Sequence, residues 1–256
     1  MENVENKNNN TEHLILGEMP ELPYSIEEAL NRLRINIGFL GSDVKVIMMI
    51  SSEPNEGKSF LSVNLWKQMA EAGARSLLLD LDLRNSVMAT KYNMHLESGT
   101  AIKGSSDFLA GNDDNIEDFI YHTEIEKADI LPNVNNLVNP SMLLEGKRLK
   151  NLLKYVSEKY RYVFLDVPPM TMVSDGERLG SMCDGAILCV RGGVTSRSVV
   201  RRTVQQLERS GCPLLGIVLN RVGGAGTGYY SKYYGKYYGK KYYSSKYYGN
   251  KYYGSK

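Results

Sequence analysis

The sequence is short of several features that mark secreted, zinc-bound or membrane-spanning proteins. Its three cysteines in 256 residues form no CxxC pair, so neither a zinc site nor a disulfide framework is expected. No apolar run approaches the roughly 18 residues that a membrane-spanning helix needs. The polar start, MENVENKNNN, does not look like a signal peptide. We therefore expect a soluble protein of the reducing cytoplasm.

Acidic side chains are missing from the C-terminal segment. From Gly223 onward the chain has seven lysines and no aspartate, glutamate or arginine. Since the whole chain has a net charge of +2, residues 1–222 have a net charge of −5. A basic segment attached to an acidic body can dock on an acidic surface of the same or a neighbouring molecule.

The same segment has no aliphatic residue after its glycine-rich start, so it cannot form a core. It holds twelve of the eighteen tyrosines, always as adjacent pairs. We expect residues 223–256 to be a disordered, repetitive tail on a glycine hinge. The tyrosines of the pairs are Tyr229, Tyr230, Tyr233, Tyr234, Tyr237, Tyr238, Tyr242, Tyr243, Tyr247, Tyr248, Tyr252 and Tyr253.

The remaining chain predicts one domain of class α/β. Residues 1–22 lack apolar periodicity and are expected to be a flexible arm, followed by a domain over 23–222. A helix is expected to start at Ser25 as N-cap, with Glu28 three residues later. Beyond it, five apolar strand-like runs alternate with longer amphipathic stretches, which indicates a doubly wound, mainly parallel sheet with helices on both faces. The strands are expected at 44–50, 76–81, 162–167, 185–190 and 214–220, with a weak strand at 129–131, and the helices at 58–72, 140–158 and 196–210.

A phosphate-binding loop is expected where the first of these runs meets a helix. The segment Gly57-Lys58-Ser59 fits the end of the Walker A pattern GxxxxGK[ST], although Ser52 replaces its first glycine. Backbone amides and the helix N-terminus stabilise an anion there, Lys58 can reach the β and γ phosphates, and the Ser59 hydroxyl can bind Mg²⁺. An ordinary loop with a chance match is the competing interpretation.

Carboxylates at two other strand ends favour the phosphate site. Asp166 follows the apolar run 162–165, and Asp80 and Asp82 follow the run that begins at Ser76. Carboxylates at such places are costly to bury unless they meet a cation. Three of them beside a phosphate loop predict a Mg²⁺-nucleotide site over unrelated helix caps or solvated charges.

With these motifs in order, the chain resembles the bacterial tyrosine kinases (BY-kinases) of capsular or extracellular polysaccharide synthesis. The resemblance lies in SSEPNEGKS at 51–59, DLDLR at 80–84, DVPP at 166–169 and the tyrosine cluster. It implies an ATP-dependent protein-tyrosine kinase in which Lys58 binds phosphate, Ser59, Asp82 and Asp166 surround Mg²⁺, and Asp80 is the base that takes the tyrosine proton.

Further residues are expected around the nucleotide. Arg84 compensates charge or holds the transferred phosphate, with an ordinary surface arginine as the alternative. Asn220, at the end of the last run, contacts the base or simply caps the strand. The loop residues expected to line the cofactor are Ser52, Glu53, Asn55, Glu56, Gly57, Lys58, Ser59 and Phe60.

Partners follow from the same resemblance. The tail is the acceptor of phosphate, and a base-stacking segment that binds nucleic acid is the disfavoured alternative. The family has a membrane-anchored activator, a polysaccharide co-polymerase, which is expected here as a separate chain that recruits the kinase to the inner face of the membrane. A tyrosine phosphatase and a ring of unphosphorylated copies are expected too. The ring motif ExxRxxR reads Glu28, Asn31 and Arg34, so its central arginine is missing.

Other classes fit less well. ATPases that partition DNA or position division sites share the loop, but they have a lysine where this chain has Glu53, and they lack a tyrosine tail. A GTPase needs an NKxD segment, which is absent from the sequence. An adaptor with a dead nucleotide site is disfavoured because Lys58, Asp80, Asp82 and Asp166 are all present.

Overall fold

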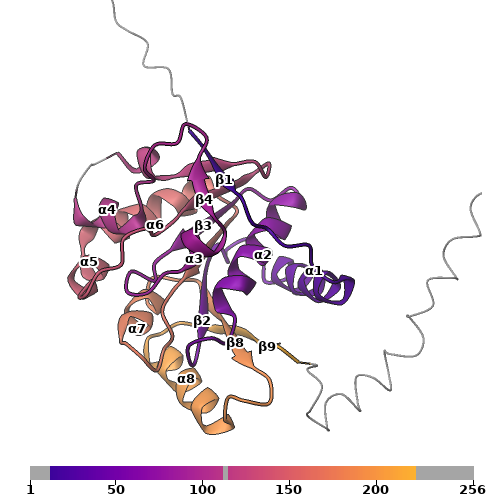
Figure 1. The fold of residues 1–256 in the computed structure, drawn as a ribbon. Coiled ribbons are helices and arrows are strands. Elements are labelled where there is room, and N and C mark those ends of the chain that lie inside the picture. Colours follow the sequence, from indigo (N-terminus) through magenta and orange to yellow (C-terminus); the bar gives the residue numbers. More distant parts are fainter. Residues whose placement is uncertain (1–11, 112–114, 223–256) are drawn as a thin grey trace, which may run out of the picture.

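The computed structural model describes residues 12–111 and 115–222, which build one nine-stranded sheet with helices on both faces (Figure 1). The strand order is β4-β1-β5-β6-β3-β7-β2-β8-β9. All neighbours pair in parallel except β1 with β4 and β5 with β6, which are antiparallel. The predicted α/β class with a mainly parallel sheet is confirmed.

The apolar runs of the sequence form the centre of the sheet, because strands covered on both faces need apolar side chains on both. β2, β3, β7 and β8 are buried almost throughout. The strands are β1 (His13–Leu16), β2 (Val46–Ser51), β3 (Ser76–Asp80), β4 (Met94–Leu96), β5 (Tyr121–Thr123), β6 (Ala128–Leu131), β7 (Tyr162–Asp166), β8 (Gly185–Arg191) and β9 (Leu214–Asn220).

Alternate residues of each strand point to opposite faces, and this divides the core in two. Ile47 and Met49 pack with α1 (Tyr24–Gly38), α2 (Lys58–Glu71) and α3 (Met88–Lys91). Val46, Met48 and Ile50 pack with the helices of the other face. Those helices are α4 (Ser105–Ala110), α5 (Ser141–Glu145), α6 (Lys147–Lys159), α7 (Asp175–Gly180) and α8 (Arg197–Arg209), with the short 3-10 helix η1 (Ile116–Phe119) nearby.

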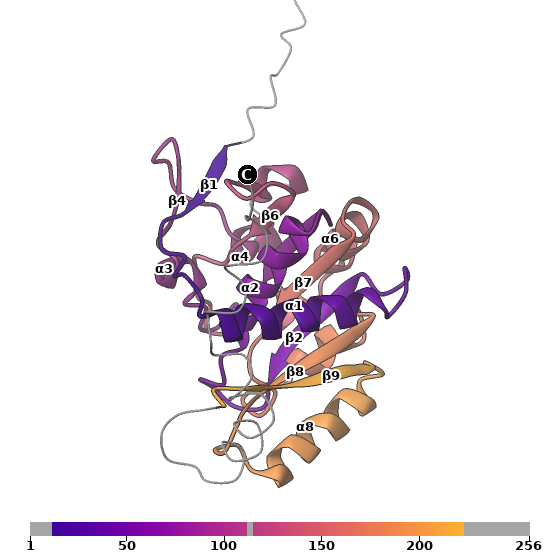
Figure 2. The ribbon, with the colours of Figure 1, turned by 90° about the vertical axis from the view of Figure 1, so that its right-hand side faces the viewer.

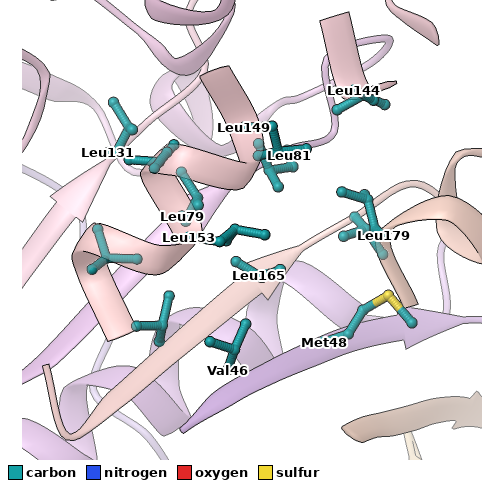
Figure 3. Packing of buried hydrophobic residues seen from close by; sticks show 14 of the residues in the cluster. Val46, Met48, Leu79, Leu81, Leu131, Leu144, Leu149, Leu153, Leu165 and Leu179 are labelled. Carbon is teal, nitrogen blue, oxygen red and sulfur yellow. The ribbon is translucent and has the colours of Figure 1, made fainter. Parts of the chain in front are cut away.

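The second of these cores is a dense leucine cluster. Leu149 and Leu153 from α6 lie over Leu79 and Leu165 of the neighbouring strands β3 and β7 (Figure 3). This packing holds the carboxyl ends of β3 and β7 in fixed register, with Asp80 opposite Asp166. Within residues 12–111 and 115–222, no helix is long and apolar enough to cross a bilayer.

Three local expectations are wrong. The flexible arm predicted over 1–22 includes a strand of the sheet, because His13–Leu16 forms β1 between β4 and β5, with Leu14 fully buried. Helix α1 begins at Tyr24 after Pro23, and Ser25 is not its cap; proline fixes a backbone angle suited to a helix start. The single helix expected over 140–158 is two helices, since Gly146 interrupts it in an extended conformation.

Candidate active site

The phosphate loop joins β2 to α2 at the carboxyl edge of the sheet. Gly57 precedes α2 with a left-handed backbone, φ 95°, a conformation that glycine adopts without strain. A Cβ at this position would lie 2.0 Å from Nδ2 of Asn220, so only glycine fits. The N-terminal amides of α2 therefore open toward the edge where the carboxylates gather, as an anion-binding loop requires.

Lys58, Ser59 and Asp166 meet directly in this structure. The Nζ of Lys58 lies 2.6 Å from Oδ2 of Asp166, and Oγ of Ser59 donates to the same oxygen at 2.7 Å. Oγ of Ser62, one helical turn further along α2, donates to Oδ1 of Asp166 at 2.7 Å. Asp166 is 2% exposed, and these three donors satisfy a buried carboxylate that would otherwise be costly.

Asp80 and Asp82 lie beside this cluster. Burial, and next the nearby charge of Asp166, raises the pKa of Asp80 to about 8, while Ser86 donates a short hydrogen bond to its Oδ2. Burial also raises the pKa of Asp82, against the opposing effect of Lys58. A carboxyl whose pKa lies near neutrality can take and release a proton at physiological pH.

Glu56 points away from the phosphate side of the loop and braces it from within. Its Oε2 accepts the backbone N–H groups of Ser52 at 2.6 Å and Glu53 at 2.9 Å. Its Oε1 accepts the N–H of Arg191 at 3.3 Å and the hydroxyl of Thr195. Glu56, which the sequence predicts to contact the cofactor, therefore ties the loop to the end of β8. The N–H groups of Ser52 and Glu53 are already hydrogen-bonded to its carboxylate.

Asn220 lies against the loop backbone. Its Nδ2 donates to the carbonyl of Glu56 at 2.9 Å, and its Oδ1 accepts the N–H of Arg221 at 2.8 Å. Ser52 is fully buried and accepts a hydrogen bond from Thr203 of α8 at 3.0 Å. Asn55 is exposed at the loop tip with a left-handed backbone, φ 62°. The loop is thus held by β9 and α8 as well as by β2.

Arg84 is engaged by a buried carboxylate on α7. Its guanidinium bonds both oxygens of Asp175, at 2.6 and 3.2 Å, and donates to Oγ of Ser141 at 3.0 Å. The hydrogen bond to Asp175 raises the pKa of Arg84, which keeps it charged. Arg84 therefore links the exit of β3 to α5 and α7.

Phe60 faces a pocket of about 350 Å³ lined by Gly17–Pro20, Lys91 and Tyr92.

The donor set fits a magnesium ion held together with a nucleotide. Ser59, Asp82 and Asp166 offer hard oxygen ligands, which Mg²⁺ prefers. Among residues 12–111 and 115–222, no three acidic, histidine or cysteine side chains form a self-contained metal site. Mg²⁺ beside a phosphate loop is normally bound through one or two protein oxygens, phosphates and water, so these residues can supply the protein's share.

Sequence reasoning missed some of the groups that hold the site. Ser62 follows Lys58 by four residues, so its helical spacing alone placed it on the same face of α2. Asp175 and Thr195 had no such signal, because each lies far in sequence from its partner, and Ser86 reaches back to Asp80 from the irregular loop after β3.

Other predicted residues do not join this cluster. On α1, Glu28 bonds Arg32 at 3.1 Å, and Arg34 bonds Oδ1 of Asn31 at 2.7 and 3.2 Å. The twelve predicted phosphoacceptor tyrosines, Tyr229 to Tyr253, lie outside the described residues.

The parallel sheet, the phosphate loop and the facing carboxylates define a P-loop nucleotide-binding protein. The model of the AAA domain family matches residues 44–183, more than half of the chain. Tyrosine-protein kinase CpsD of Streptococcus agalactiae is 35% identical over 217 residues, which cover 84% of this chain and 93% of the relative. The chain belongs to the bacterial tyrosine kinase family.

Solved structures agree. The kinase domain of the Escherichia coli tyrosine kinase ETK superposes with a TM-score of 0.68 and 28% identity, covering 79% of each chain. The septum site-determining protein MinD of Pyrococcus horikoshii reaches a TM-score of 0.59 at 23% identity, covering 70% of this chain and 71% of its own. The likeness to MinD is one of fold, so it gives no support to the competing assignment as a spatial-organisation ATPase.

Proposed function

We propose that this protein-tyrosine kinase transfers the γ-phosphate of ATP to the tyrosine pairs of its own C-terminal segment, in trans between copies. The observation that supports this best is the register of β3 and β7, which sets Asp80 opposite Asp166 beside Lys58 and Ser59. Asp166, with its three donors, lies next to a second carboxyl with a raised pKa, so phosphate binding and proton transfer fall to different groups.

The protein's own groups divide the reaction between them. Lys58 and the amides at the start of α2 bind and neutralise the phosphates. Asp80 accepts the proton of the tyrosine hydroxyl when it is in its ionised form, while the tyrosine oxygen bonds to phosphorus and ADP leaves. Ser59, Asp82 and Asp166 would hold Mg²⁺, which when bound neutralises charge on the phosphates. Arg84 is a positioning residue, because it fixes the exit of β3 against Asp175.

The biological setting proposed is polysaccharide assembly. The chain acts in the cytoplasm at the inner face of the membrane, where a separate membrane-anchored co-polymerase activates it. It assembles as a ring while unphosphorylated, a tyrosine phosphatase reverses the modification, and no nucleic acid is involved. Through this cycle it regulates the polymerisation and export of capsular or extracellular polysaccharide.

The proposal is tested by incubating the purified full chain with ATP and Mg²⁺ and mapping phosphate by mass spectrometry. Phosphotyrosine is expected in the pairs between 229 and 253, and Lys58→Met should abolish it. Lys67→Met, on the exposed side of the same helix, is the matched control and should retain the activity. Circular dichroism shows whether both variants keep the fold. Undiminished phosphorylation in the Lys58 variant would remove the loop from the mechanism.

A further inference from the structure

The arginines of this chain divide along the sequence. In each of the seven arginines before residue 180, the guanidinium group bonds to another residue. Arg75, for example, pairs with Asp129, and Arg178 pairs with Glu145. The four arginines of α8, Arg197, Arg201, Arg202 and Arg209, are all exposed, and no ion pair or side-chain hydrogen bond joins them to any residue within 12–111 or 115–222. We call these four the arginine face.

The arginine face occupies one side of α8. With about 100° between successive helical residues, the four side chains span an arc of about 140°. The opposite side of the helix packs on the body through Thr203 and Leu207, which are fully buried. Glu208, the only acidic residue on α8, is exposed within the same arc, so the helix face keeps a net charge of +3. A face this basic and this exposed fits an anionic ligand.

The C-terminal segment leaves the body next to this helix. The N–H of Gly192, in the connection from β8 to α8, donates to the carbonyl of Asn220 at 2.9 Å. A Cβ on Gly192 would lie 3.0 Å from Val222, the last described residue. Figure 2 shows α8 alongside β8 and β9 at this end of the sheet. Val222, to which the C-terminal segment is attached, therefore lies beside the connection that leads into α8.

The C-terminal segment is long enough to reach the arginine face. Tyr229 follows Val222 by seven residues, and an extended chain spans up to about 3.3–3.6 Å per residue. The 13 residues of α8 cover about 20 Å at 1.5 Å per residue. The tyrosine pairs of one copy can thus lie along the arginine face of the same copy.

Whether this contact forms depends on the charge of the C-terminal segment. Residues 191–222 hold six arginines, one glutamate and no lysine or aspartate, a net charge of +5. They repel the unmodified segment, whose seven lysines give it +7. Each phosphotyrosine adds about −1.5 to −2 and three acceptor oxygens, and arginine binds phosphate through two parallel hydrogen bonds.

We propose that the arginine face of α8 binds the chain's own C-terminal segment once its tyrosines are phosphorylated. This rests on the proposed function, since the occupant is the product of that reaction. The unmodified segment is drawn to the acidic part of the molecule, residues 1–190, whose net charge is −10. Phosphorylation moves it to the basic end and holds it away from the active site of a neighbour.

The test uses a synthetic peptide, so that it does not depend on the kinase being active. Full-length Lys58→Met protein, whose own segment stays unmodified, is titrated into fluorescent peptide 229–238 phosphorylated at Tyr230, Tyr234 and Tyr238, and anisotropy is measured. The phosphopeptide should bind at least about tenfold more tightly than the unmodified peptide, and less tightly at high salt. Failure of autophosphorylation in the wild type would leave this result untouched.

Two matched triple variants in the same background locate the site. Arg197→Gln with Arg201→Gln and Arg202→Gln should weaken phosphopeptide binding at least about tenfold. Lys147→Gln with Lys150→Gln and Lys154→Gln removes the same charge from exposed positions of α6 and should change it less than about twofold. Equal losses in both variants would reduce the effect to net charge and overturn the proposal.

A membrane surface is the other class of ligand that such a face could take. Co-sedimentation with phosphatidylglycerol vesicles is measured on the same proteins. If the arginine variant loses vesicle binding while the phosphopeptide binds neither protein, the face is a lipid site and the proposal is wrong. Phosphopeptide binding that depends on the arginine face supports it, whatever the vesicles do.

Discussion

At the scale of single residues, the active site places Asp80 where a carboxylate is least stable. Its side chain is fully buried, and Asp166 faces it from the neighbouring strand. Burial raises the pKa of this group from 3.8 to about 8, which means that folding favours its protonated form. Such a residue serves the reaction at the expense of stability.

Replacing Asp80 by Asn should therefore abolish phosphoryl transfer and stabilise the fold. Between pH 4 and 8 the unfolded carboxyl is ionised while the folded one keeps its proton, so the wild type loses stability as pH rises. In EDTA, the melting temperature of Asp80→Asn should exceed that of the wild type by an amount that grows from pH 5 to pH 8. About 1 kcal/mol corresponds to roughly 2–4 °C in a domain of this size. A pH-independent difference in calorimetry would contradict the buried, protonated carboxyl.

Glu56 offers a second test at this scale. Glu56→Gln keeps the shape but leaves one oxygen, so either the N–H groups of Ser52 and Glu53 or the N–H of Arg191 lose their acceptor. Leaving buried donors unpaired costs about 1–3 kcal/mol, so the loop should loosen and the KM for ATP should rise about tenfold or more. Steady-state kinetics measures this, with Glu158→Gln on the exposed side of α6 as control. An unchanged KM would show that the brace does not shape the nucleotide site.

At the scale of helices and strands, the sequence predicts those elements that have a long apolar or amphipathic run. β2, β3, β7, β8, β9, α2 and α8 all lie within two residues of their expected bounds, because buried parallel strands and amphipathic helices have distinct periods. β1, β4 and β5 were missed, as strands of three or four residues are too short to show a period. They form through pairing with remote partners, which no local pattern encodes.

The candidate site divides in the same way. Lys58, Ser59, Asp80 and Asp166 were predictable because strand ends of a parallel sheet meet at one edge. The roles of Glu56, Asn220 and Arg84 were not, since their partners come from β8, the loop backbone and α7. Residue type and spacing indicate that a group is near the nucleotide. They do not indicate which way its side chain turns.

Helix α1 gives a prediction about assembly. Asn31, where the family motif has its central arginine, holds Arg34 at 2.7 Å, and Glu28 is paired with Arg32. We expect a weak ring that still needs Glu28 and Arg34, so Glu28→Ala should lower the mass measured by light scattering. Asn31→Arg should release Arg34 and raise the mass.

Asn36→Arg adds the same charge to an exposed position of α1 and is the control for Asn31→Arg. Equal masses for the wild type and Glu28→Ala would remove this helix from the interface.

At the scale of the whole molecule, the tyrosines that we propose as acceptors and the nucleotide site belong to different parts of the sequence. Asp166, Thr203 and Asn220, all among the described residues, hold the phosphate loop. Deleting residues 229–256 should therefore leave ATP affinity within about twofold while removing most autophosphorylation. Equilibrium binding of a fluorescent ATP analogue and phosphate incorporation are the two measurements. A large loss of affinity would show that the segment is part of the nucleotide site.

The position of β1 also determines the order in which the molecule can be completed. Leu14 pairs with Leu96 on one side and Thr123 on the other, so β1 is synthesised well before either of its partner strands. Translation adds about 5–20 residues per second, which leaves β1 unpaired for several seconds on the ribosome. During that time the nascent chain exposes an apolar strand that has no pairing partner. This strand is where a chaperone would bind the nascent chain.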